Sequence, residues 1–385
     1  MDKLYYLDNA ATTKVFAEVF DLMKTNNEES FFNPSASYSK ALDSKKILNN
    51  AKKQIVSALH GAGGKLYFTS SATESNNTVF NGVHLRAGDE VLISKGEHPS
   101  VYNSAHALEK KGIVVKDIPL NKNGVVDKNK FELLLNQNVK IVSIIHVSNE
   151  TGAINDIKDL VSSVKKYNSK ILFHSDGVQA FGKIKVNLQD LGVDLYTISA
   201  HKIYAPRGIA GLWVKQGVVI DPLLFGGGQE DGFRSSTENV GGAIAFAYAV
   251  KKVTDELELN YQKVLDLKKQ LVEKFKQSQI VKYIKFNSCD SNSPYVLSVS
   301  FSGIKGEVLM HALEQDGVLI STGSACSSKK AGNRTLEAME ISNSDVIGSV
   351  RISFSPYLEY DFDYIVQAFE KNVLRFEKNV NVKKW

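Results

Sequence analysis

Short runs of apolar residues, each followed by small or polar residues, recur along the first half of the chain. Runs with the length and composition of β-strands lie at residues 65–69, 90–94, 139–145, 170–176 and 194–199. Apolar side chains at helical spacing predict an amphipathic helix over residues 37–60. We expect the strands to belong to an open α/β sheet, in which ligands bind beyond the carboxyl ends of the strands.

The second half of the chain has a different pattern. A long helical pattern begins at Val240 and continues to Lys276, and it is followed by an alternating strand over 295–301 and a helix over 305–316. A length of 385 residues predicts two or three domains. We place a domain boundary within the long helical pattern.

Two neighbouring strand ends carry an acid and a lysine, Asp176 and Lys202. Pyridoxal phosphate (PLP) chemistry needs such a pair. The lysine forms a Schiff base with the aldehyde, and the acid keeps the pyridine nitrogen protonated so that the ring withdraws electrons. The alternative is an ordinary exposed lysine near a turn. Ser199 and His201, which can donate hydrogen bonds to a phosphate, favour the PLP interpretation.

Small polar residues at 70–77 separate the first strand from a second predicted helix. Free backbone N–H groups and the positive end of the dipole bind anions at the start of a helix, so Ala72 and Thr73 are candidates for holding a phosphate. A simple helix cap is the alternative. The glycine-rich residues 61–65 lack the spacing of a nucleotide-binding P-loop, and we interpret them as a turn.

Composition narrows the classes of function. Lys and Arg number 47 against 42 Asp and Glu, so the formal net charge of +5 is a weak signal over this length, and no dense basic block indicates nucleic acid binding. Two cysteines are too few for a disulfide framework and suit a reducing compartment. The start of the chain lacks a signal-peptide core, and the longest apolar stretch is too short to span a bilayer. We expect a cytoplasmic protein without membrane contact or a metal site.

Several motifs resemble one known family. The sequence Ser-Ala-His-Lys-Ile-Tyr-Ala-Pro-Arg-Gly at 199–208 looks like the lysine motif of the class V aminotransferase group. Within that group it is most similar to the cysteine desulfurases of the NifS/IscS type. The resemblance extends, with motifs in the same order, from Tyr6–Thr13, which it places along the substrate entrance, to Arg351–Phe354.

This resemblance implies an α/β fold, the PLP-dependent transferase fold-type I. The large PLP-binding domain would comprise residues 13–257, around a mostly parallel sheet of the seven-stranded type. Residues 1–12 and 258–385 would form a smaller α+β domain.

The resemblance also assigns residues to the cofactor. His98 would stack on the face of the PLP ring, where its imidazole can also move protons. Asn149 and Gln179 would contact the phenolic oxygen. Thr237, in the glycine-rich residues 225–239, would reach the PLP phosphate of the other subunit, which makes a homodimer part of the active site. A flexible linker is the alternative interpretation of that run.

For the substrate, the resemblance indicates two further residues. Asn33 and Arg351 would bind its carboxylate, Arg351 as a bidentate pair that lysine cannot copy. The chain departs from the family pattern at five positions, and we expect these to alter the substrate pocket, the packing beside Asp176 and the charge at the dimer edge. The departures are Phe32, Tyr38, Gly177, Val178 and Asp231.

Cys326 stands in a run without bulky residues, near Lys329 and Lys330. Neighbouring positive charge lowers the pKa of a thiol and makes it a nucleophile. A buried structural cysteine is the alternative. The resemblance favours the nucleophile, which would form a persulfide and deliver its sulfur to a partner protein.

The implied reaction converts L-cysteine to L-alanine. Lys202 would take the Cα proton, His98 would move protons, and Cys326 would take the sulfur. An acceptor or scaffold protein would then receive it for iron–sulfur clusters, thio-cofactors or tRNA thiolation. Three alternatives stay open: a selenocysteine lyase, another class V aminotransferase, and a sulfur-relay scaffold that keeps PLP without independent activity.

Overall fold

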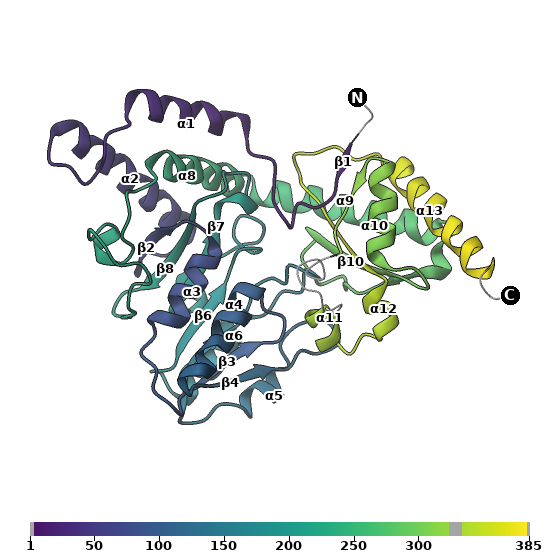
Figure 1. Ribbon diagram of the computed structural model, residues 1–385, viewed down its shortest axis with the longest axis horizontal. Coiled ribbons are helices and arrows are strands. Elements are labelled where there is room, and N and C mark those ends of the chain that lie inside the picture. Colours follow the sequence, from purple (N-terminus) through teal and green to yellow (C-terminus); the bar gives the residue numbers. More distant parts are fainter. Residues whose placement is uncertain (1–3, 323–332, 383–385) are drawn as a thin grey trace.

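The computed structural model describes residues 4–322 and 333–382. Its largest sheet has seven strands and lies in the left half of Figure 1. The strand order is β2-β8-β7-β6-β5-β3-β4. Only β8 runs against the others, because it pairs antiparallel with both β2 and β7. The strands are β2 (Gly64–Thr69), β3 (Glu90–Ser94), β4 (Val114–Ile118), β5 (Val139–Ser143), β6 (Leu172–Asp176), β7 (Leu195–Ser199) and β8 (Ala210–Lys215). The mostly parallel α/β sheet that we predicted is confirmed.

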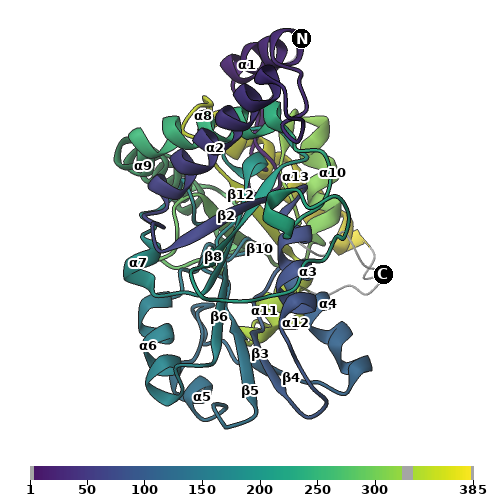
Figure 2. The same cartoon turned by 90° about the vertical axis from the view of Figure 1, so that its left-hand side faces the viewer.

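Both faces of the sheet are buried, as a parallel sheet requires. In β3, Leu92 belongs to one apolar cluster, whereas Val91 and Ile93 belong to another on the opposite face. Figure 2 shows α5, α6 and α7 on one side of the strands and α3 and α4 on the other. The helices of this region are α1 (Ala17–Glu29), α2 (Ser39–Ala58), α3 (Ala72–Gly82), α4 (Pro99–His106), α5 (Lys128–Glu132), α6 (Ile157–Tyr167), α7 (Leu188–Leu191) and α8 (Val240–Asp255).

A second region, at the right of Figure 1, has an apolar core of its own. Strands β12, β10 and β9 form an antiparallel sheet in that order. The N-terminal strand β1 (Tyr5–Tyr6) joins this region by pairing with β11 (Val318–Leu319). The other elements are α9 (Leu257–Gln277), β9 (Ile284–Phe286), β10 (Val296–Phe301), α10 (Gly306–Gln315), α11 (Arg334–Ala338), α12 (Asn343–Ile347), β12 (Ser349–Ser353) and α13 (Phe362–Val382).

The separate cores support the division of the chain that we propose, with residues 13–257 in the large domain. Tyr5 and Leu7 are buried in the same cluster as residues of α9, β10 and α13. The long helical pattern also breaks there, because α8 ends at Asp255 and α9 begins at Leu257.

The parallel strands bring the predicted functional residues to one edge of the sheet. β2, β3, β5, β6 and β7 all end there, and ligands bind at such an edge in open α/β sheets. A 3-10 helix, η2 (Ala200–Lys202), follows β7 directly and carries Lys202 to this edge. Within the part of the chain that the structure describes, no helix is long and apolar enough to cross a membrane.

Candidate active site

A cavity of about 340 Å³ opens at the edge of the sheet where these strands end. Its volume lies in the range of sites for small ligands and cofactors. The smaller region contributes to it through the N-terminal segment and β12. The predicted site residues that line it are Ala72, Thr73, His98, Asn149, Asp176, Gln179, His201, Lys202 and Arg351.

Other predicted residues do not line this cavity. Asn33 and Thr237 are exposed elsewhere, and Oδ1 of Asn33 accepts a hydrogen bond from the backbone N–H of Ser35 at 2.9 Å. Ser199 is buried at the end of β7. Cys326 lies outside the described residues, so its predicted role stays a prediction.

Lys202 is held against the N-terminal segment. Its Nζ donates hydrogen bonds to the backbone carbonyls of Ala10 at 2.7 Å and Ala11 at 2.6 Å. Burial lowers the pKa of Lys202 to about 8, and the positive charge of Arg351 acts in the same direction. The amine is therefore neutral in a substantial fraction of molecules near pH 8, which an attacking or proton-accepting lysine requires.

Asp176 is buried at the end of β6, and both of its carboxylate oxygens are engaged. Oδ2 accepts a hydrogen bond from Nδ2 of Asn76 at 2.9 Å, and Oδ1 accepts one from the backbone N–H of Val178 at 3.0 Å. These donors fix the direction in which the carboxylate faces the cavity. An acid so placed can hold a positively charged ring nitrogen.

The start of α3 forms the anion-binding side of the cavity. Ser71 caps the helix, because its Oγ accepts a hydrogen bond from the backbone N–H of Glu74 at 3.2 Å. Ala72 and Thr73 line the cavity at the positive end of the helix dipole.

His201 lines the same cavity, and its neutral imidazole can donate a hydrogen bond. Burial and the nearby positive Lys202 and Lys183 lower the pKa of His201 to about 4. Nδ1 of its imidazole lies 3.1 Å from Oγ1 of Thr12. When the Thr12 hydroxyl donates to Nδ1, Nε2 carries the proton and can donate to an anion.

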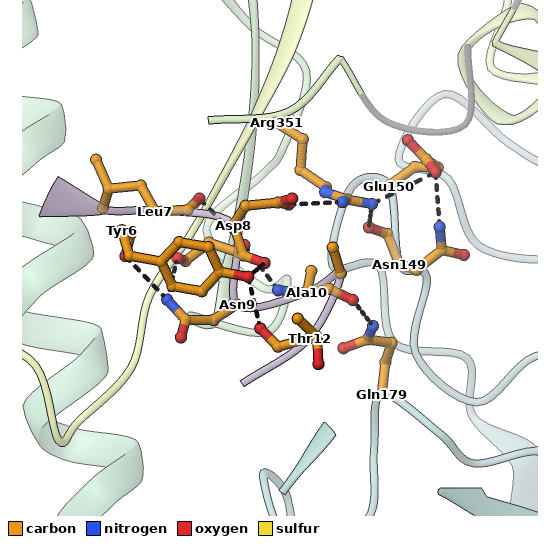
Figure 3. A network of polar contacts seen from close by, with 12 residues as sticks. Tyr6, Leu7, Asp8, Asn9, Ala10, Thr12, Asn149, Glu150, Gln179 and Arg351 are labelled. Carbon is orange, nitrogen blue, oxygen red and sulfur yellow. Dashed lines mark hydrogen bonds and ion pairs between the residues drawn. The ribbon is translucent and has the colours of Figure 1, made fainter. Parts of the chain in front are cut away.

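Gln179 is fixed by two partners. Its Nε2 donates to the carbonyl of Ala10 at 2.9 Å (Figure 3). Its Oε1 accepts from Nζ of Lys183 at 2.6 Å. Lys183 is almost fully buried, and burial lowers its pKa to about 7. The amide group of Gln179 consequently keeps its N–H side toward Ala10, a residue that lines the cavity.

Arg351 is tied to both regions of the chain (Figure 3). Its Nη2 lies 2.9 Å from Oδ1 of Asp8, and its Nη1 donates to the carbonyl of Asn149 at 3.0 Å. Oε1 of Glu150 lies 3.7 Å from Nη1 and also accepts a hydrogen bond from Nδ2 of Asn149 at 2.6 Å. Glu150 further accepts from Asn333, the first described residue of the second segment, at 3.0 Å.

Sequence reasoning did not single out several of these residues. Glu150 directly follows Asn149 in the same polar turn, so adjacency was an available signal. Asp8 stands inside the N-terminal motif that we placed along the substrate entrance. Ser100 follows His98 by two positions, so adjacency was a signal there too. Asn76 and Lys183 carried no signal of their own, because neither shows in its own segment which residue its side chain contacts.

Comparisons with known proteins identify the family. The model of the family "Aminotransferase class-V" matches residues 5–361. The cysteine desulfurase IscS of Dictyoglomus turgidum is 34% identical over 381 residues, which cover 96% of each chain.

Solved structures give the same picture. A NifS-like protein has a TM-score of 0.89 at 30% identity, over 97% of this chain and all of that one. A structure of SspA in complex with cysteine has a TM-score of 0.80 at 28% identity, over 93% of this chain and all of that one. With the sheet edge, the lysine and the acid in place, the chain belongs to the class V aminotransferase family and, within it, to the cysteine desulfurases of the NifS/IscS type.

Proposed function

We propose that the cavity binds PLP and that the protein uses it to convert L-cysteine to L-alanine with transfer of the sulfur. The observation that carries this proposal is the position of Lys202. Its amino group, with a pKa of about 8, shares one cavity with the buried Asp176 and the free start of α3.

The predicted site residues suit each functional group of PLP: its phosphate, its pyridine nitrogen and its phenolic oxygen. The start of α3 and His201 suit the phosphate. The Oγ of Ser199 is buried without a hydrogen-bond partner among the described residues and does not line the cavity, so its contact with the phosphate stays a prediction. Asp176 suits the pyridine nitrogen, and Asn149 and Gln179 suit the phenolic oxygen. PLP, when bound, supplies a ring that stabilises negative charge on the Cα of an amino acid.

The chain's own residues then divide the work. Lys202 takes the Cα proton, because its lowered pKa leaves a neutral amine available. Arg351 holds the substrate carboxylate. The thiolate of Cys326 bonds to the substrate sulfur as the carbon–sulfur bond breaks, which leaves a persulfide on Cys326 for an acceptor protein. SspA, a related protein solved in complex with cysteine, supports cysteine as the ligand.

A homodimer completes this proposal. Thr237 is exposed and does not line the cavity of its own chain, as a residue that serves the partner's PLP phosphate would be placed. Large apolar side chains are exposed near it in sequence and on the segment after α1: Phe225 is 83% exposed and Phe31 is 68% exposed. Exposed apolar groups of this size favour a protein interface.

The test measures alanine and sulfide released from L-cysteine by PLP-loaded protein with a reducing thiol. The wild type should release both in matching amounts, and Cys326→Ala should release neither while it still binds PLP. Lys202→Ala should lower kcat by about 10²–10⁴-fold. Cys289→Ala is the matched control, because the Cys289 thiol contacts Ser291 and Asn292 and does not line the cavity. Alanine and sulfide release by Cys326→Ala at the wild-type rate would contradict the proposal.

A further inference from the structure

A row of hydrogen bonds joins His98 to Asp176. Nδ1 of His98 lies 2.8 Å from Oγ of Ser100. That Oγ accepts a hydrogen bond from Nδ2 of Asn76 at 2.9 Å, and the same Nδ2 donates to Oδ2 of Asp176 at 2.9 Å. His98, Ser100 and Asp176 line the cavity, whereas Asn76 is fully buried on α3.

The chemistry of Asn76 gives this row a direction. An amide nitrogen has two N–H donors, and an ionised carboxylate only accepts. Nδ2 of Asn76 therefore donates one N–H to Asp176 and the other to Ser100. The opposite orientation of the amide would place Oδ1 against the carboxylate, and two acceptors cannot bond to one another. The contact with Asp176 therefore decides the orientation, which leaves Oδ1 buried without a partner in the described part of the chain.

Ser100 in turn donates a hydrogen bond to His98. Because its Oγ accepts from Asn76, its own proton is free to be donated to Nδ1 of His98. The backbone N–H of Ser100 also donates to Nδ1, at 3.1 Å. Nδ1 of His98 thus accepts hydrogen bonds from both the hydroxyl and the backbone N–H of Ser100, so Nδ1 must be the unprotonated nitrogen of the ring.

We propose that Asn76 and Ser100 are positioning residues that hold His98 as a neutral imidazole with its proton on Nε2. This inference rests on the proposed function and deepens it. A ring in this state offers Nε2–H as a hydrogen-bond donor to a ligand in the cavity. Its only lone pair, on Nδ1, faces Ser100 and cannot take a proton from the substrate. His98 therefore donates, and proton removal falls to Lys202.

The charges around His98 agree with a neutral ring. Burial lowers the pKa of His98, and the positive charges of Lys202 and Arg334 act in the same direction. Asp176 and Glu150 oppose them and would favour the imidazolium. The hydrogen bond from Ser100 to Nδ1 also stabilises the neutral ring, because protonation of Nδ1 breaks this bond.

The test reads the ring itself by ¹⁵N NMR of the PLP-free protein over a pH series. His98→Gln identifies the His98 signals among those of the eight histidines. At pH 7.5 the wild type should show a protonated Nε2 and an unprotonated Nδ1 on a neutral ring. Ser100→Ala should raise the midpoint of the His98 titration by about 0.5–1 pH unit, because one donor to the neutral form is gone. Ser100→Thr, which keeps the hydroxyl, should restore the midpoint.

Matched controls separate this role from a loss of packing. Asn76→Ala should also raise the His98 midpoint, whereas Asn77→Ala on the same helix should not, because the Asn77 amide donates to the carbonyl of Thr73. Ser104→Ala should leave it unchanged, because the Ser104 hydroxyl bonds to backbone carbonyls of α4. If Asn76→Ala fails to fold, the comparison of Ser100→Ala with Ser100→Thr still tests the inference.

Two results would overturn the inference: a proton on Nδ1 in the wild type, or an unchanged midpoint in Ser100→Ala. With PLP and L-cysteine, Ser100→Ala should lower kcat and leave KM within about twofold, because the residue acts through His98. A protein with the expected tautomer that releases no alanine from L-cysteine would overturn the proposed function alone.

Discussion

At the scale of single residues, Gly177 and Tyr196 form a matched pair beside Asp176. A Cβ built on Gly177 would lie 2.1 Å from Cζ and 2.3 Å from the hydroxyl oxygen of Tyr196. The Tyr196 ring is fully buried, and its hydroxyl is fixed 2.8 Å from Nδ1 of His146. The tyrosine therefore fills the space that an alanine at 177 would use, which gives a physical reason for the glycine where the family pattern has alanine.

Gly177→Ala should consequently destabilise the fold by about 1–3 kcal/mol, because the buried ring has to shift. The double variant with Tyr196→Leu should recover part of the loss, since the shorter side chain vacates the space. Urea denaturation of both variants measures this. Gly63→Ala, where an added Cβ meets nothing within 4 Å, is the control and should stay within about 0.5 kcal/mol of the wild type. A Gly177→Ala variant as stable as the wild type would refute the pairing.

The lowered pKa of Lys202 predicts how PLP uptake depends on pH. Neutral amine accumulates as the pH rises through about 8, whereas an ordinary lysine needs a pH above about 10. The rate of PLP uptake by PLP-free protein should rise with a midpoint near 8. Asp8→Asn should move the midpoint lower, because the negative Asp8 raises the pKa of Lys202.

Stopped-flow absorbance measures this rate, and the same series with N-acetyl-lysine amide corrects for the titration of PLP itself. A wild-type midpoint near 10, or an upward shift in Asp8→Asn, would contradict the electrostatic account of this site.

At the scale of elements, the glycine-rich segment is anchored to the large domain before it reaches Thr237. Arg234 donates to the two carboxylate oxygens of Glu74, in the first turn of α3, at 2.8 and 3.2 Å. The pair is mostly buried, with 20% and 10% of the two side chains exposed. Glu230, buried in the same segment, pairs with Lys52 at 2.6 Å. These contacts hold the segment against the large domain close to Thr237 in sequence.

Arg234→Ala should cost about 2–4 kcal/mol of stability, because Glu74 would be left mostly buried without its partner. Thermal unfolding measures the loss, and limited proteolysis should cut residues 225–239 faster. Lys65→Ala is the matched control: it removes a pair to Asp231 in which both side chains are about 70% exposed, 69% and 71%. Its effect should stay below about 1 kcal/mol. Equal losses in the two variants would disprove the anchoring role.

At the scale of the whole molecule, the sequence predicted the parts that local pattern controls. The apolar runs became strands with small changes at their ends; the run at 170–176, for example, begins as β6 at Leu172. The strands β4 and β8 were not predicted. The apolar run of β8 directly follows the lysine motif, and β4 is only partly buried and carries Lys116 and Asp117 among its apolar residues.

The site was predictable where a strand end or a motif marks it, as at Asp176, Lys202 and Arg351. It was not predictable where folding brings together residues far apart in sequence. Asn76 and Asp176 are separated by 100 positions, and Asp8 and Arg351 by 343, yet each pair is joined by a hydrogen bond. Such contacts leave no local pattern, because nothing in the segments of Asn76 and Asp8 shows which distant residue each will contact.

The proposed homodimer makes a prediction that concerns the whole assembly. Lys202→Ala and Thr237→Ala subunits, each defective alone, are co-expressed so that mixed dimers form. If Thr237 serves the partner's cavity, one site of each mixed dimer combines an intact Lys202 with an intact Thr237. About a quarter of all sites should then be active, since half of the dimers are mixed and each has one complete site. If Thr237 served its own chain, every site would lack one residue, and cysteine turnover at the level of the two variants assayed singly would refute the shared site.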